Sequence, residues 1–111
     1  REWGLTYDAL AAINPALVRA QVTSSLVFGL SAALHGEITI RDGQVQQSSF
    51  EDYPVLRMSE CPPMSVHLLD SEKPPGGVGE IAVPLVAPAL CNALFAATGQ
   101  RARTLPLRAR T

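Results

Sequence analysis

The chain has 111 residues, of which 47% are hydrophobic, 17% are charged and 5% are aromatic. This length fits one small domain with a modest core, and the charged fraction is below the usual ~25%, which suggests a surface that other protein covers. Nine basic residues balance ten acidic ones, giving a formal net charge of −1 that excludes a basic field for holding a nucleic-acid backbone.

The first half of the chain predicts a long helix followed by a hairpin. The chain begins with Arg1 rather than methionine, so we expect it to be processed or cut from a longer protein, and alternation over residues 3–7 weakly favours an edge strand. Asn14 and Pro15 form a helix-start signal, and apolar residues then recur at three- and four-residue spacing. We therefore expect a helix over residues 15–34, ended near Gly36. Several of its residues are small, so other backbone can approach it closely: Ser24, Ser25, Gly29, Ala32 and Ala33.

The clearest local signal is Asp42-Gly43, a turn pair between residues 37–40 and 44–47 that predicts a β-hairpin. Residues 48–63 have no periodicity and predict an extended loop. Alternation over residues 64–69 predicts a short strand.

Residues 71–79 predict a second loop, and Pro88 can open a helix over residues 89–98 that stops at Gly99. The expected fold class is α+β, with two helices, a β-hairpin and short strands, four or five strands in all. No apolar run reaches the ~18–20 residues that a membrane span needs. The whole resembles a segment of a larger architecture.

The stretch from Pro74 to Glu80 is the most informative part of the sequence. Its three glycines let backbone amides approach a ligand closely, and such a turn can form a concave nest of donors for an anion or oxyanion. Glu80 follows directly and could serve as a general base beside a bound, charged cofactor. Taken alone, a glycine-rich loop with a solvated glutamate explains the stretch equally well. The spacing matches neither a P-loop nor a dinucleotide fingerprint.

A series of short motifs extends this stretch in both directions. In chain order they are Ala12-Ile13-Asn14-Pro15, Val18-Arg19-Ala20-Gln21, Phe28-Gly29-Leu30, Gly36-Glu37-Ile38, Asp42-Gly43, Gln46-Gln47-Ser48, Asp52-Tyr53-Pro54-Val55-Leu56-Arg57-Met58, Gly76-Gly77-Val78-Gly79-Glu80, Ala87-Pro88-Ala89, Asn92-Ala93-Leu94-Phe95-Ala96-Ala97-Thr98-Gly99 and Leu105-Pro106-Leu107. Together they resemble the C-terminal part of the molybdopterin-binding large subunit of the xanthine dehydrogenase/aldehyde oxidase family, in its isoquinoline 1-oxidoreductase-like branch.

The resemblance implies a division of the chain and a set of site residues. Residues 12–107 would be the C-terminal portion of a molybdopterin-binding domain, with 1–11 unassigned and 108–111 a tail. Glu80 would be the catalytic base, the amides of Gly77, Val78 and Gly79 would lie near the cofactor, and Gln21 would hydrogen-bond it. No residue of this chain is expected to ligate a metal directly.

The same resemblance implies the cofactors and partners. Molybdenum-molybdopterin would be bound mainly by upstream parts of the subunit, and electrons would leave to iron–sulfur clusters on a 2Fe-2S small subunit. The substrate would be a small aldehyde or N-heterocycle, hydroxylated with water as the oxygen source. The lone chain would be inactive, and both cytoplasm and periplasm remain open as its compartment.

The chain departs from the family pattern around the site. Relatives usually have glycine or another small residue where this chain has Ser24-Ser25, and Pro-Gly where Ile81-Ala82 follows the glutamate. These departures keep a second hypothesis open, a catalytically inactive remnant or subunit-interaction fragment. A third is a free-standing domain that binds a small anion through its glycine loop.

Most other polar residues have structural interpretations. Cys61 and Cys91 are expected to be free thiols, with a disulfide as the alternative. We expect His35 to help satisfy the last carbonyls of the first helix and Asp52 to make a turn hydrogen bond. His67 has no catalytic partner pattern, and Tyr53 and Arg57 could line a cofactor or an interface. The C-terminal arginines are expected to be a solvated tail, with a subunit contact or an anion site as the alternatives: Arg101, Arg103, Arg108 and Arg110.

Overall fold

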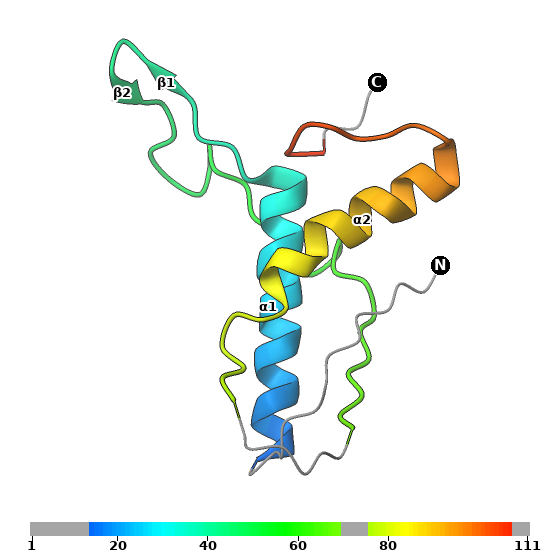
Figure 1. The fold of residues 1–111 in the computed structure, drawn as a ribbon. Coiled ribbons are helices and arrows are strands. Elements are labelled where there is room, and N and C mark those ends of the chain that lie inside the picture. Colours follow the sequence, from blue (N-terminus) through cyan, green and yellow to red (C-terminus); the bar gives the residue numbers. More distant parts are fainter. Residues whose placement is uncertain (1–13, 70–75, 108–111) are drawn as a thin grey trace.

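The computed structural model describes residues 14–69 and 76–107, which form two crossing helices and a projecting hairpin (Figure 1). Helix α1 (Pro15–His35) runs through the middle of the molecule, and α2 (Val83–Thr98) packs across it. Strands β1 (Ile40–Arg41) and β2 (Gln44–Val45) extend away from the C-terminal end of α1. The α+β class with short strands, predicted from the sequence, is confirmed.

Local signals fix both ends of α1. The side chain of Asn14 accepts a hydrogen bond from the Leu17 amide at 3.1 Å, and Pro15 begins the helix. At the other end the Gly36 amide donates to the carbonyls of Ala32 and Ser31, at 3.1 and 3.2 Å. The helix therefore ends within one residue of its predicted limit.

The hairpin turns at Asp42 and Gly43, as predicted. Their φ angles of 50° and 75° are both positive, as a two-residue type I′ turn requires. The strands pair antiparallel with Ile40 opposite Val45, and the Gln46 amide continues the ladder by donating to the Thr39 carbonyl at 2.9 Å. The hairpin is confirmed, with strands shorter than the predicted segments.

Helix α2 corrects the sequence prediction, because it begins at Val83 rather than after Pro88. Pro84 lies in its first turn, where the missing amide costs nothing, and Pro88 lies inside the helix. The fully buried Val86 packs against α1, and this tertiary contact stabilises a turn that the proline at 88 would otherwise disfavour. The predicted end is confirmed: Gly99 adopts φ 73°, and its amide donates to the Phe95 carbonyl at 2.7 Å.

The strand predicted over residues 64–69 is not formed. Met64, Val66 and Leu68 are half-buried and alternate with exposed Ser65, His67 and Leu69, so the period-two pattern is real, but no other described segment pairs with it. The described part of the chain holds two strands rather than four or five. The predicted edge strand over residues 3–7 lies outside the described residues.

The core is small and lies where the helices cross. Among the described residues the buried apolar side chains are Leu30, Ala33, Ala82 and Val86. Many large apolar side chains of the described residues are exposed instead, among them Phe28, Phe50 and Met58. Exposed apolar side chains of this kind are typical of a segment that packs on further protein.

Helix α1 meets the length and composition of a membrane span, with a mean hydropathy of 1.4 over its best 18 residues. The sequence analysis predicted no membrane-span-length apolar run because polar residues interrupt the apolar ones in this helix. Three segments distant in sequence contact the C-terminal half of α1: Gly79 at Ser25, Leu56 at Ser31 and Leu107 at Ala33. Only 22% of the apolar window is buried in this chain.

Candidate functional site

The glycine-rich stretch leads from the side of α1 into the start of α2 (Figure 1). The Ser25 hydroxyl donates to the Gly79 carbonyl, with 3.4 Å between the two oxygens. One residue later, the Glu80 carbonyl accepts from the Val83 amide at 3.2 Å. The backbone on each side of Glu80 is thereby tied to a helix.

One face of α1 carries the residues around this stretch. Gln21, Ser25 and Gly29 are spaced four residues apart and so lie above one another on a helix. Gly29 contacts α2 and Ser25 contacts Gly79, while Gln21 is exposed one turn nearer the N-terminus. The fold thus brings Gln21 and the segment from Gly77 to Glu80, implied as site residues by the resemblance, to the same side of α1.

The glycines provide open space beside the backbone. A Cβ placed at Gly77 or Gly79 would meet no atom within 4 Å. The amides of Gly77, Val78 and Gly79 donate no hydrogen bond to another described residue, so they are available to an electronegative group. Neither Gly77 nor Gly79 has a positive φ, so the expected nest does not take the form that requires left-handed glycines.

The Glu80 side chain is exposed at this open surface. Within residues 14–69 and 76–107 its carboxylate makes no hydrogen bond or ion pair. A carboxylate held by a fixed backbone but free at its oxygens can accept a proton from a bound group.

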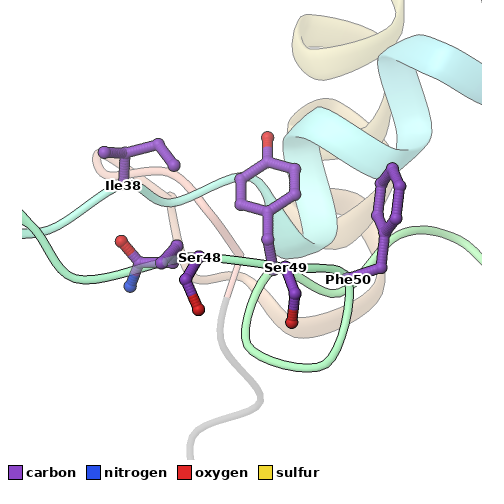
Figure 2. Close-up of a pocket in the computed structure, with 6 residues that line it drawn as sticks. Ile38, Ser48, Ser49 and Phe50 are labelled. Atoms are coloured by element: carbon purple, nitrogen blue, oxygen red, sulfur yellow. The ribbon is translucent and has the colours of Figure 1, made fainter.

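A shallow hollow of about 310 Å³ lies elsewhere, at the base of the hairpin. Figure 2 shows Ile38 on one side, Phe50 on the other, and Ser48 and Ser49 on the loop between them. Its lining residues are Ile38, Gln47, Ser48, Ser49, Phe50 and Tyr53. None of its lining residues belongs to α1 or to the segment from Gly77 to Glu80, so the hollow is a different feature from the Gln21–Glu80 face. Tyr53 therefore lines a surface hollow rather than the glycine loop.

Asp52 closes the loop beneath this hollow, as the sequence predicted. Its carboxylate accepts from the amides of Ser48 and Ser49 at 2.9 Å and from the Ser48 hydroxyl at 3.0 Å. The hydrogen bonds from the Ser49 and Ser48 amides lower the pKa of Asp52 below its usual 3.8.

His35 differs from its predicted role at the end of α1. Its Nε2 atom lies 3.4 Å from Oε1 of Glu60, and Gly36 rather than His35 binds the helix-end carbonyls of Ser31 and Ala32. Nε2 is buried without a geometrically satisfactory hydrogen bond, so we describe the contact as a close approach between the two side chains. The other oxygen of Glu60 accepts from the Arg57 amide at 2.8 Å, which places Arg57 in a structural turn.

Cys61 and Cys91 are free thiols, as expected. Within the described residues no three side chains of His, Cys, Asp or Glu are grouped so as to hold a metal ion.

Comparison with known proteins gives the family. The model of the molybdopterin cofactor-binding domain matches residues 3–62, more than half of the 111-residue chain. The chain belongs to the molybdopterin cofactor-binding domain family.

Individual relatives of the chain are much longer proteins. It is 39% identical over 95 residues to the isoquinoline 1-oxidoreductase subunit beta of Brevundimonas diminuta, which covers 86% of the chain and 12% of the relative. It is 34% identical over 101 residues to a Gluconacetobacter polyoxogenes protein named membrane-bound aldehyde dehydrogenase [pyrroloquinoline-quinone], covering 91% of the chain and 13% of the relative. That name specifies pyrroloquinoline quinone, whereas the matching family model is that of a molybdopterin cofactor-binding domain.

A solved structure supports the fold independently. The Cu,Mo-CO dehydrogenase in its carbon monoxide reduced state superimposes with a TM-score of 0.70 at 26% identity, over 79% of this chain and 12% of that one. The chain thus spans about an eighth of the length of the relatives it matches. The resemblance found in the sequence is confirmed at the level of the family.

Sequence reasoning missed the hydrogen bond from Ser25 to Gly79. The two residues are 54 positions apart, and nothing in either local pattern links them. The available signal was the four-residue spacing from Gln21 through Ser25 to Gly29.

Proposed function

We propose that this chain forms the C-terminal part of the cofactor-binding subunit of a molybdenum hydroxylase, an oxidoreductase that hydroxylates an aldehyde or N-heterocycle with water as the oxygen source. One observation carries the proposal: the fold brings Gln21 and the segment from Gly77 to Glu80 to one open side of α1. The family match supplies the cofactor class, molybdenum-molybdopterin.

The residues present suit such a cofactor. The Gln21 amide can donate and accept at once, as the edge of a pterin requires. The amides of Gly77, Val78 and Gly79 are free donors for an electronegative group, and the missing side chains at both glycines leave room for close approach. The bound cofactor supplies the redox chemistry, and the protein supplies position and proton handling.

Glu80 has the proton-transfer role in this proposal. Its backbone is held between α1 and α2 while its carboxylate is exposed on the open side. A general base at this position accepts the proton released as water oxygen enters the substrate, a contribution of about 10²- to 10⁴-fold to the rate.

The remaining parts of the enzyme belong to other protein. This chain corresponds to 12–13% of the relatives compared, so most cofactor contacts and the substrate channel would come from the rest of the subunit. A 2Fe-2S small subunit would receive the electrons. Exposed apolar side chains fit this partnership, among them Phe28, Ile40, Phe50 and Met58, which are 69–93% exposed.

The molybdenum content and native mass of the protein purified from its own cell test this proposal. We expect near-stoichiometric molybdenum in a complex far heavier than 11.8 kDa. A chain without molybdenum, alone or with a partner, would support an inactive remnant or interaction fragment instead. Pyrroloquinoline quinone in place of molybdenum would reject the cofactor assignment.

A further inference from the structure

We propose that Ser25 is the positioning residue for Glu80, acting through the Gly79 carbonyl. This inference rests on the proposed function, because it assigns Ser25 a part in placing the base.

The contact is buried on its Ser25 side. Ser25 is only 5% exposed, and its hydroxyl donates to the carbonyl of Gly79, the exposed residue directly before Glu80, with 3.4 Å between the two oxygens. The buried Ser25 hydroxyl loses hydration on folding, and this pairing avoids leaving it unsatisfied. Movement of Gly79 away from α1 would break this pairing.

A second fixed point lies just beyond Glu80. Its carbonyl accepts from the Val83 amide, and Val86, one turn further along α2, packs directly on Gly29 of α1. The short segment from Gly79 to Val83 is therefore attached to α1 at Ser25 and, through α2, at Gly29. Two anchors one helical turn apart on the same face of α1 define where the Glu80 backbone lies.

The neighbouring serine provides a matched control. Ser24 is exposed and makes no hydrogen bond to another described residue through its hydroxyl. Ser25→Ala and Ser24→Ala remove the same atom from adjacent positions of one helix, so their difference isolates the contact with Gly79.

The test compares these variants in the complete enzyme purified from its own cell. Hydrogen exchange of the peptide covering residues 79–82 is the readout that does not depend on turnover. We expect Ser25→Ala to speed this exchange about tenfold and to lower kcat about ten- to a hundredfold, with molybdenum content and KM unchanged. Ser24→Ala should match the wild type, and Ser25→Thr, which keeps the hydroxyl, should recover most of both properties.

Each outcome decides the inference. Unchanged exchange and kcat in Ser25→Ala overturn it. Equal effects from Ser24→Ala, or loss of molybdenum together with kcat, indicate a general structural role and also overturn it. If Ser25→Ala does not fold, Ser25→Cys, whose thiol is a much weaker donor than the hydroxyl, takes its place. Faster exchange and lower kcat with molybdenum retained then support the inference, and wild-type values of both overturn it.

Glu80→Gln separates this inference from the proposed function. If Glu80→Gln is inactive while Ser25→Ala is normal, Glu80 is the base and Ser25 does not position it. If Glu80→Gln retains full turnover, the proposed function fails, and no positioning of a base is left for Ser25 to perform.

Discussion

Gly29 of α1 lies directly against Val86 of α2, so closely that a Cβ at position 29 would come within 2.6 Å of Cγ2 and 2.8 Å of Cβ of Val86. The carbonyl oxygen of Val83 would be 3.0 Å away. This contact sets the distance between the two helices that together hold the Glu80 segment.

Gly29→Ala should therefore destabilise the protein despite the better helix propensity of alanine. Overpacking costs about 1–3 kcal/mol, against a gain of about 1 kcal/mol from replacing glycine inside a helix. Because the obstructing atoms include Cβ and backbone oxygen, no rotamer change relieves them, so we expect an overpacking cost at the upper end, about 2–3 kcal/mol, and a net loss of about 1–2 kcal/mol in the free energy of unfolding. Thermal unfolding measures it, with exposed Ser24→Ala as the neutral control; a Gly29→Ala protein as stable as the wild type would mean that the helices do not cross this closely.

The hairpin offers a test of the missing partner surface. Ile40 and Val45 face each other across the strands and are 70% and 56% exposed, while Arg41 and Gln44 occupy the opposite face. If the rest of the subunit covers the apolar face, Ile40→Asp buries a charge at the interface and should lower recovery of the chain in the large complex by at least about tenfold.

Gln44→Asp adds the same charge to the other face of the same hairpin and should leave assembly unchanged. Size-exclusion chromatography of the native complex gives both values. Equal recovery of the two variants would mean that the apolar face of the hairpin is not covered.

The lowered pKa of Asp52 predicts that the stability of its loop depends on pH. Its folded-state pKa lies below the ordinary value of 3.8, chiefly because the amides of Ser49 and Ser48 donate to the carboxylate. A lowered folded pKa means that the contribution to stability is complete above the unfolded value and is lost as pH falls through the folded value. We expect the segment 48–53 to loosen below about pH 4, as hydrogen exchange corrected for its intrinsic pH dependence would report.

The adjacent Glu51 provides the comparison for this effect. Its carboxylate is exposed and binds no other described group. Glu51→Gln should preserve the loosening and Asp52→Asn should abolish it. A pH response that survives in Asp52→Asn would assign the titration to another group.

The parts of the fold that could be predicted are those coded by neighbouring residues. Asn14, Pro15 and Gly36 mark the ends of α1 locally, and Asp42-Gly43 specifies the hairpin turn. The start of α2 could not be read in the same way, because Pro88 is a valid helix start by itself. Only the contact of Val86 with Gly29, between residues distant in sequence, shows that the helix begins earlier.

The candidate site likewise combines residues that sequence reasoning singled out with a contact that only the tertiary structure reveals. Gln21 was singled out through resemblance alone, whereas the glycine-rich stretch already marked Glu80 as a possible base and the resemblance gave it a definite role. Their placement on one side of α1 depends on the bond between Ser25 and Gly79, which no local rule indicates. Residues 64–69 show the converse case: the alternation was read correctly, but a strand also needs a partner, and the described part of the chain contains none for it.

The central claim is that Glu80 is the base of a molybdenum active site, and turnover of Glu80→Gln in the molybdenum-loaded complex tests it most directly. Glutamine keeps the size of the side chain and its hydrogen-bonding capacity but cannot accept the proton at the pH of the assay. We predict that the variant keeps its molybdenum and native mass while kcat falls about 10²- to 10⁴-fold. Normal turnover with molybdenum bound would contradict the role of Glu80.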